Sequence, residues 1–336
     1  MNNRYKSFKK GLEDLSNKEI RDKHERELLK PEVLRKNIEE LEKLDLSTIT
    51  DDALSKLIDE KIGIIGFASH IYSAGNEIFR ARINEGGKPF QKVSEIGAPA
   101  TKYITKYGRA NKPGERIFYG AYSLFIALGE LVLNPKTIED HNGTINLTVG
   151  KYIVMENLHL VSILHDKKLQ EARMDIKKQA ESLPKHRHQY SNSSNESRDL
   201  IIEFFAKQFT KRNILSPSDY KISCLYMNKV KWANNQILQR DGNQKFDGIN
   251  YPSVASKFKG DNVALFTELA KRKLKIVGAY HVECSNINVE KCEFTVKTKF
   301  HARGMKDGVL MWDYENYIGH EEEPAENPHY KFPNSH

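Results

Sequence analysis

The sequence predicts an α+β protein in which a helical N-terminal region precedes a larger region of interspersed strands and helices. Three observations lead to this fold class. Apolar residues recur at helical spacing through residues 5–62, strand-like alternation begins near residue 77, and neither an internal repeat nor regular βαβ alternation follows. We therefore expect a helical region at 1–65, a main domain at 66–320 with an insertion around 135–245, and a polar tail at 321–336.

The expected N-terminal helices contain the runs LLKPEVLRKNIEELEKL and DALSKLIDEKIG. Pro31 suits a first helical turn, and Thr50 or Asp51 can cap the second helix. Residues 1–60 hold 13 Lys and Arg against 15 Asp and Glu. Such a charged helical segment is either a packing appendage or a partner-binding face, and the pattern leaves both interpretations open.

The main domain begins with alternating residues typical of a strand, EIFRARI at 77–83, followed by polar chain to about residue 115. RIFYGAY (116–122) predicts a second strand, and SLFIALGELVL (123–133) predicts a buried helix. The remaining patterns predict strand, turn and strand at 144–158, an amphipathic helix at 166–183, a loop at 184–197, helices at 198–209 and 219–239, and strands in FDGINYPSV, NVALF, KLKIVGAYHVEC and KCEFTVKTKF.

The 336 residues carry a net charge of +8, and the excess lies outside the N-terminal region. Residues 88–116 alone hold seven basic residues against two acidic ones. This asymmetry favours an anionic partner, such as a nucleotide, a nucleic acid or phosphate. An ordinary solubilising surface charge is the alternative.

The three cysteines, at irregular spacing, predict neither a disulfide framework nor a zinc site. His281, Cys284 and Cys292 could bind a metal only with a further pair of ligands, which the sequence lacks, so we expect no metal. The sequence shows no apolar leader and no run long enough to cross a membrane. We expect a cytoplasmic protein without a membrane partner.

Arginines and a polar loop form the first candidate binding features. Arg80 and Arg82 are two residues apart on an expected strand and so point to one face. On a buried face they would need an anion, whereas an exposed face would make them ordinary surface residues. In GRANKPG (108–114), Arg109 adds charge, Asn111 tolerates unusual dihedrals, and free N–H groups could cradle a phosphate. Taken alone, this loop is explained more simply as a plain turn.

A carboxylate and a serine form the other candidate features. Glu130 follows an apolar run, so it is either paired, functional or a helix-end residue that reaches solvent. Placed carboxylates stabilise positive charge on an anomeric carbon, as glycosyl transfer requires. DGINYPSV brings a strand to Tyr251 and Ser253, and no nucleophile elbow surrounds this serine.

Together these pieces resemble the RES domain family, named for its Arg, Glu and Ser. The matching segments are FRAR around Arg80, GRANKPGERIFYGAYSLFIALGE with Tyr119 and Glu130, and DGINYPSV with Ser253. Their order over residues 77–266 carries the resemblance. Members often have tryptophan where Ala110 stands, and this chain is longer than the compact members.

The resemblance implies a mixed sheet core like that of ADP-ribosyltransferases, with NAD+ as a substrate split at the nicotinamide–ribose bond and no cofactor. It implies that Arg80 binds the NAD+ phosphates, helped by Arg82, Arg109 and Asn111. Tyr119 would pack against nicotinamide or its ribose with Tyr251 nearby, Glu130 would stabilise the developing cation, and Ser253 would position the ribose. Compact members resemble toxins of toxin–antitoxin pairs.

The leading hypothesis is therefore an NAD+-degrading glycohydrolase or phosphorylase, a toxin-like effector of the kind used in phage defence. Its expected partners are NAD+, an antitoxin or regulatory protein, and further copies of the chain through the N-terminal helices. One alternative is an ADP-ribosyltransferase that modifies a macromolecule. A non-enzymatic nucleic-acid-binding protein is the other, and it rests only on the basic charge.

Overall fold

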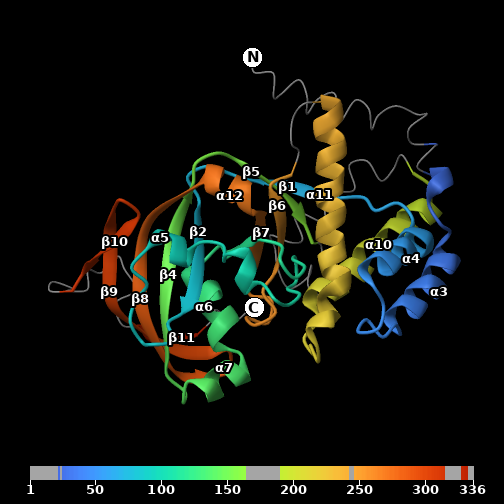
Figure 1. Cartoon of the computed structure of the whole chain (residues 1–336). Coiled ribbons are helices and arrows are strands. Elements are labelled where there is room, and N and C mark those ends of the chain that lie inside the picture. Colours follow the sequence, from blue (N-terminus) through green and yellow to red (C-terminus); the bar gives the residue numbers. More distant parts are fainter. Residues whose placement is uncertain (1–21, 23–24, 164–189, 242–245, 315–326, 332–336) are drawn as a thin grey trace. The chain divides into compact units, whose positions relative to one another are not determined.

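The structure is a computed structural model of the chain, and it describes residues 22, 25–163, 190–241, 246–314 and 327–331. The chain divides into two compact units, residues 1–68 with 164–208 and residues 69–163 with 209–336 (Figure 1). The mixture of helices with a large mixed sheet confirms the α+β class. The helix expected at 166–183 lies outside the described residues.

The first unit is helical. It contains α3 (Pro31–Glu42), α4 (Asp51–Ile62) and most of α10 (Asn192–Thr210). Pro31 occupies the first turn of α3, and the Thr50 hydroxyl accepts the Ala53 N–H, so both sequence expectations for these helix starts are confirmed. Each of the two helices buries one apolar stripe at helical spacing. The stripes are formed by Leu34, Ile38 and Leu41 in α3 and by Leu54, Ile58 and Ile62 in α4.

The prediction of a loop at 184–197 is wrong for residues 192–197, which form the first turns of α10. Ser191 explains the difference. Its Oγ accepts the Ser194 N–H at 3.1 Å, and its own N–H donates to Glu25 Oε1 at 2.7 Å. Serine-rich sequence is typical of loops, but a serine directly before a helix also satisfies a free N–H of its first turn.

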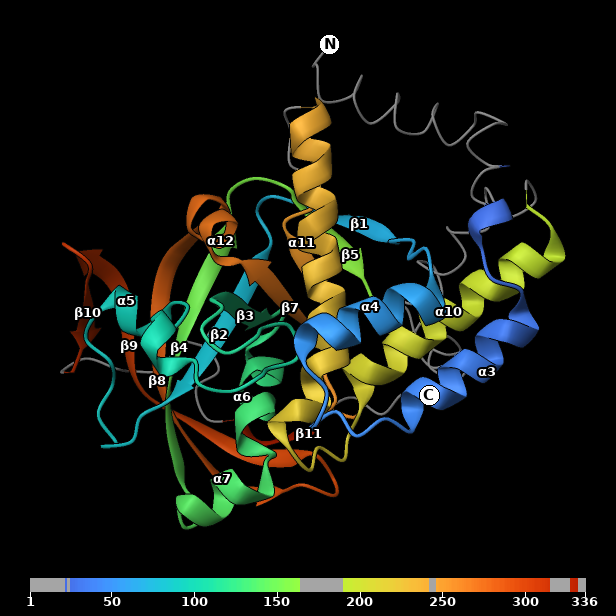
Figure 2. The same cartoon turned by 45° about the vertical axis from the view of Figure 1, so that its right-hand side comes forward.

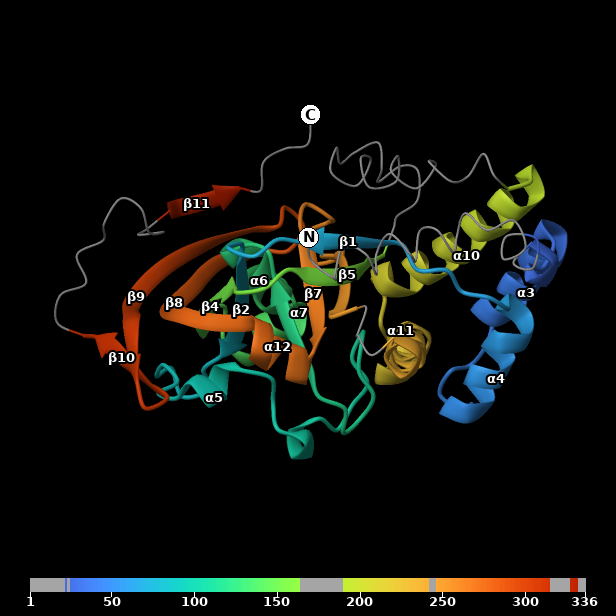
Figure 3. The same cartoon turned by 90° about the horizontal axis from the view of Figure 1, so that it is seen from above.

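The second unit is built on one mixed sheet. Over the described residues its strand order is β1-β5-β6-β7-β3-β2-β4-β8-β9-β10, and β11 also pairs with β9. All neighbours are antiparallel except β5 and β6, which are parallel. The long strands β8 and β9 curve visibly in Figure 3. The strands are β1 (Ser69–Tyr72), β2 (Glu77–Ile83), β3 (Ile117–Ala121), β4 (Ile145–Val154), β5 (Leu158–Ser162), β6 (Gly248–Pro252), β7 (Asp261–Phe266), β8 (Leu274–Asn288), β9 (Glu293–Lys306), β10 (Val309–Asp313) and β11 (Asn327–Lys331).

Helices connect these strands and cover the sheet. They are α5 (Val93–Ile96), α6 (Leu124–Val132), α7 (Pro135–Asp140), α11 (Lys221–Asp241) and α12 (Thr267–Lys273), with short 3-10 turns at Thr101–Tyr103 and Pro217–Tyr220. Figure 2 shows α6 and α7 in green, directly after β3 in the chain. Asn234 of α11 exchanges two hydrogen bonds with the backbone of Phe246, at 2.7 and 2.8 Å, which joins this helix to the start of β6.

One expectation about the strands needs correction, and another is confirmed with its boundaries shifted. The strand, turn and strand expected at 144–158 appear as β4, a bend at residues 155 and 156, and β5, and β4 runs unbroken through Gly150. A Cβ there would lie 2.8 Å from the Tyr152 ring and 3.0 Å from Ile96, so this glycine makes room for side chains. The polar tail expected at 321–336 contains β11, so that expectation is wrong for its five residues.

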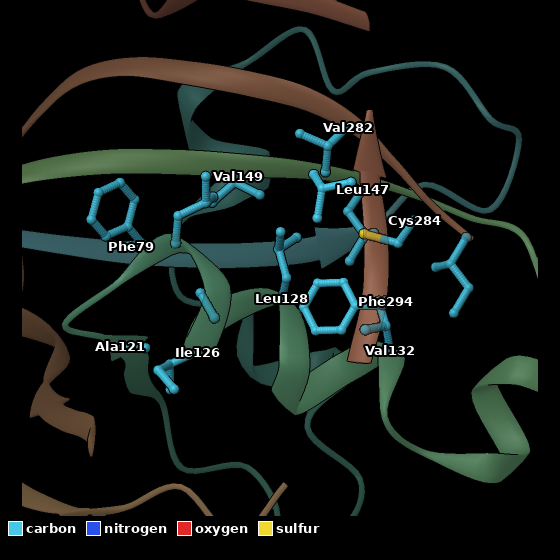
Figure 4. Packing of buried hydrophobic residues seen from close by; sticks show 14 of the residues in the cluster. Phe79, Ala121, Ile126, Leu128, Val132, Leu147, Val149, Val282, Cys284 and Phe294 are labelled. Atoms are coloured by element: carbon cyan, nitrogen blue, oxygen red, sulfur yellow. The ribbon is translucent and has the colours of Figure 1, made fainter. Parts of the chain in front are cut away.

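The sheet has an apolar cluster on each face. Figure 4 shows the first cluster, where Leu128 and Val132 of α6 pack on Leu147 and Val149 of β4 and on Phe79 of β2. The second cluster joins the other face to Ile96 of α5 and Ala270 of α12. Because side chains alternate along β2, Ile78 and Phe79 belong to different clusters, and this alternation decides where the candidate arginines point.

Buried histidine makes the stability of the second unit depend on pH. His281 of β8 is 3% exposed, and burial, followed by Lys299, lowers its pKa below the ordinary value. The unfolded chain therefore binds this proton more readily, so the free energy of unfolding should fall as the pH drops below about 6.5. His281→Phe should retain the stacking on Phe300, whose ring centroid is 5.7 Å away. In this variant the free energy of unfolding should fall less steeply as the pH drops.

Urea unfolding at about pH 8 and about pH 5.5 checks this prediction. His70 retains a contribution of the same sign, because burial also lowers its pKa. The free energy of unfolding of His281→Phe should consequently still fall somewhat at low pH. The same loss of stability in His281→Phe and in the unaltered chain would contradict it.

Candidate functional site

A hydrogen-bonded cluster joins Glu130, Ser253 and Asn262. Ser253 Oγ donates to Glu130 Oε1 at 2.6 Å, and Asn262 Nδ2 donates to the same oxygen at 2.7 Å. Ser253 is fully buried and Asn262 is 4% exposed, whereas Glu130 is half-buried. No described residue donates a hydrogen bond to Oε2 of this carboxylate. The structure thus brings together two of the residues predicted from sequence and adds Asn262.

Glu130 reaches this cluster because of the way α6 packs. Ser123 caps the helix by accepting the Ile126 N–H, and the apolar side of the helix packs on β2 and β4. Glu130 lies in the last turn, beside β7, where the carbonyl end of the helix dipole disfavours an anion. The two donors on Oε1 offset this cost.

Ser253 is held by the tight turn that follows β6. Its N–H donates to the Gly260 carbonyl, and its carbonyl accepts the Phe258 N–H, both at 2.8 Å. The Ser256 N–H donates to Ser253 Oγ at 3.1 Å. The hydroxyl is therefore engaged on both sides, which suits it to orient Glu130.

Tyr119 fixes the GRANKPG loop. Its hydroxyl donates to Asn111 Oδ1 at 2.7 Å and accepts the Ala110 N–H at 2.9 Å. Asn111 is 6% exposed and also donates from Nδ2 to the Lys112 carbonyl at 3.0 Å. Burial raises the pKa of Tyr119, so the phenol stays protonated and can act as this donor. The residue as a whole is partly exposed.

The arginines of β2 bind backbone carbonyls. Arg80 donates from Nε to the Gly97 carbonyl at 3.2 Å and from Nη1 to the Tyr119 carbonyl at 2.6 Å. Arg82 donates to the Glu95 carbonyl, and its guanidinium lies 5.0 Å from the centroid of the Phe90 ring. Both side chains reach segment 95–97, so they share one face of β2 as expected.

Arg116 completes this arrangement. It donates to the carbonyls of Pro99 at 2.9 Å and Ala98 at 3.2 Å, while the Tyr152 hydroxyl donates to the Ile96 carbonyl at 3.2 Å. Every carbonyl of segment 95–99 is thus bound by one of these four side chains. Arg116 was not among the predicted site residues, although it is the first residue of the strand expected at 116–122 and directly precedes the buried start of β3.

The positive charge of the three arginines, Arg80, Arg82 and Arg116, has no carboxylate partner among the described residues, and none of them forms a salt bridge there. Burial is the main cause that lowers the pKa of Arg80 to about 10. Tyr152 raises this pKa, and the nearby charge of Arg82 lowers it further. The guanidinium remains charged at neutral pH, so an anionic ligand would be favoured beside it.

Arg80 and Glu130 lie on opposite faces of β2. Phe79 faces α6, whereas Arg80 faces Phe118, with its guanidinium 5.5 Å from the centroid of that ring. Over the described residues, β2 pairs with β3 only at Phe79 and Ala121. The Arg80 side chain reaches the Tyr119 carbonyl beside this short contact, so the backbone of Tyr119 connects the two halves of the candidate site.

The two remaining candidate residues, Arg109 and Tyr251, contact the segment of chain that precedes α11. Arg109 donates to the carbonyls of Phe209 at 2.6 Å and Lys211 at 3.2 Å, which anchors the GRANKPG loop to the chain before α11. Tyr251 is 5% exposed, and its ring centroid is 5.7 Å from that of Phe209. Burial raises the pKa of Tyr251 well above its usual value.

The three cysteines are Cys224, Cys284 and Cys292. All three are free and buried, and Cys284 and Cys292 belong to the apolar cluster beneath α6. In the described part of the chain, no three His, Cys, Asp or Glu side chains are grouped so that they could hold a metal ion. None of the described helices is both long and apolar enough to cross a membrane.

Neither a scan against models of known protein families nor a search among curated proteins finds a match for this chain.

The packing around Gly108 gives a direct test of the loop geometry. A Cβ there would lie 2.4 Å from Asn111 Oδ1 and 3.0 Å from the Tyr119 hydroxyl. Gly108→Ala should separate these two groups and destabilise the protein by about 1–3 kcal/mol in urea unfolding. Gly97→Ala is the matched control, because its Cβ would make only an ordinary 3.8 Å contact. Equal unfolding midpoints for the two variants would contradict the loop geometry.

Proposed function

We propose that this chain is a RES-like enzyme that cleaves the nicotinamide–ribose bond of NAD+. In this proposal the mixed sheet is a form of the ADP-ribosyltransferase-like core. The observation that carries the proposal is the hydrogen bond between Ser253 and Glu130, which joins residues 123 positions apart in sequence. These are two of the three residue types for which the family is named, and they meet at a half-buried carboxylate.

The carboxylate suits the charge change of this reaction. When the bond between the ribose anomeric carbon and the pyridinium nitrogen breaks, its electron pair goes to nicotinamide, which leaves neutral, and positive charge develops on the sugar. The partners of Glu130 are neutral donors, so they do not cancel a negative charge on it. Its Oε2 could accept a ribose hydroxyl and stabilise the cation, which is the largest kind of catalytic contribution.

Arg80 suits the other end of the substrate. Two of its N–H groups are held by carbonyls, and its Nη2 donates to no described residue. A guanidinium fixed in this way is preorganised for a phosphate of NAD+. Tyr119, which is partly exposed between Arg80 and the GRANKPG loop, would pack against nicotinamide or its ribose.

The reaction is completed when the ADP-ribosyl group is transferred to an acceptor. Water would bond to the anomeric carbon and lose a proton, giving ADP-ribose, whereas phosphate would give the 1″-phosphate of ADP-ribose. Either reaction depletes cellular NAD+, and a toxin-like effector of this kind needs an antitoxin or other regulator. We place regulation or self-association on the helical first unit.

Chromatography of products after incubating the purified protein with NAD+, with and without phosphate, tests this function. Release of nicotinamide with small ADP-ribose products is the expected result. Label from NAD+ that becomes fixed on protein or nucleic acid in a lysate would instead support an ADP-ribosyltransferase. Absence of any nicotinamide release under both conditions would refute the proposal.

A further inference from the structure

Asn262 is placed beside Glu130 by the sheet. It lies on β7, where its register partners are Ala121 of β3 and Tyr251 of β6. Residues paired across antiparallel strands share a face, so Asn262 faces the side of the sheet on which Ala121 packs with α6. Its side chain is 4% exposed, and its Nδ2 is 2.7 Å from Glu130 Oε1.

Both donors in this cluster bind the same carboxylate oxygen. Ser253 Oγ lies 2.6 Å from Oε1, and that hydroxyl is itself fixed by the Ser256 N–H at 3.1 Å. Two hydrogen bonds to one oxygen fix the rotation of the carboxylate, and they leave Oε2 as its open oxygen among the described residues. The remaining freedom of Glu130 is small, as a preorganised catalytic group requires.

The chemical nature of the two donors is informative. The last turn of α6 contains no basic residue, and no described Lys, Arg or His forms a salt bridge with Glu130. A basic partner would stabilise the carboxylate but would also cancel its charge. Neutral donors orient the carboxylate and preserve the charge that a cationic transition state needs.

We infer that Asn262 is a positioning residue of this site, which holds Oε1 of Glu130 together with Ser253 and so directs Oε2 to the substrate. This inference rests on the proposed NAD+ cleavage. Asn262 acts through Glu130 and has no contact with the substrate of its own.

Two replacements of similar size separate hydrogen bonding from packing. Asn262→Asp preserves the shape but removes the donor at neutral pH, and Asn262→Leu removes the donor altogether. Each should lower kcat for nicotinamide release by roughly 10–100-fold and change KM by less than about threefold. A residue that only fills space would tolerate Asp well, because aspartate has nearly the shape of asparagine.

The pH profile provides a signature of the donor. Once protonated, the carboxyl group introduced by Asn262→Asp can donate its O–H to Glu130, so the kcat of this variant relative to the unaltered protein should rise from about pH 8 to about pH 5. Asn262→Leu should show no such recovery. Glu130 is the acceptor, and the nearby phenols of Tyr119 and Tyr251 stay protonated across this range because burial raises their pKa.

A double-mutant cycle gives a readout that does not depend on activity. Asn262→Asp should lower the urea midpoint at about pH 8 more in the native background than in Glu130→Gln, because the second background removes the repulsion between two carboxylates. Equal shifts in both backgrounds would overturn the contact.

The outcomes separate the inference from the function on which it rests. Nicotinamide release that survives both Asn262 variants overturns the positioning role and leaves the proposed function standing. If the unaltered protein releases no nicotinamide, the proposed function fails, and the positioning role of Asn262 in that reaction fails with it.

Discussion

Glu130→Gln is expected to lower nicotinamide release from NAD+ by roughly 10²–10³-fold with the fold intact. Glutamine has nearly the same shape, and its amide oxygen can still accept from Ser253 and Asn262, whose donor atoms lie 2.6 and 2.7 Å from Oε1. What disappears is the negative charge that opposes the developing ribose cation. Steady-state kinetics should therefore show the loss in kcat, with KM nearly unchanged.

Glu139→Gln is the matched control for this prediction. Glu139 is an exposed residue of α7, the next helix along the chain, and the substitution removes the same charge away from the cluster. It should preserve full activity. Full activity in Glu130→Gln would contradict the catalytic assignment of Glu130. Loss of activity together with a lowered unfolding midpoint would show that the substitution acts through stability.

Lys273→Met is expected to destabilise the second unit by about 3–5 kcal/mol. Lys273 Nζ lies 2.7 Å from Asp247 Oδ2, and the two side chains are 10% and 6% exposed. The lysine also donates to the Asn157 carbonyl at 3.0 Å, while Asp247 accepts the His159 N–H at 2.8 Å. Removing the lysine leaves a buried carboxylate with a single backbone donor directly before β6, the strand that leads to Ser253.

Urea unfolding measures this effect, and Lys271→Met provides the control. Lys271 pairs with Glu268 at 2.8 Å in solvent, so its loss should not change the midpoint measurably. The double variant Lys273→Met with Asp247→Asn should recover part of the loss, because it removes the unpaired charge. Equal midpoints for the two lysine variants would show that the buried ion pair contributes little.

Sequence patterns predicted the elements that carry the candidate residues. The strand predicted from the alternation of EIFRARI has the same boundaries as β2, and the apolar run after Ser123 forms α6. Strand β10 was missed, although its signal was present. Asp307 and Gly308 both have positive φ between β9 and β10, and an Asp-Gly pair is a strong hairpin signal.

Part of the site could not be predicted in this way. Asn262 lies in a strand of mostly apolar residues, where an asparagine carries no local signal. Its function depends on the register of β7 with β3 and β6, which the sequence does not reveal. The same is true of Arg80, since its strand pattern says which residues share its face but not that this face lies opposite α6.

The sequence by itself determined the α+β class, the strand bearing Arg80, the helix bearing Glu130 and the order of the motifs, because these follow from local periodicity and turn chemistry. Only the tertiary structure decided that Ser253 and Asn262 meet on one oxygen of Glu130 and that three arginines bind the carbonyls of segment 95–99. The contacts of Glu130 join residues 123 and 132 positions apart in the chain, and the arginine contacts join residues 13 to 17 positions apart. They depend on strand order and register, which are set by packing across the whole sheet.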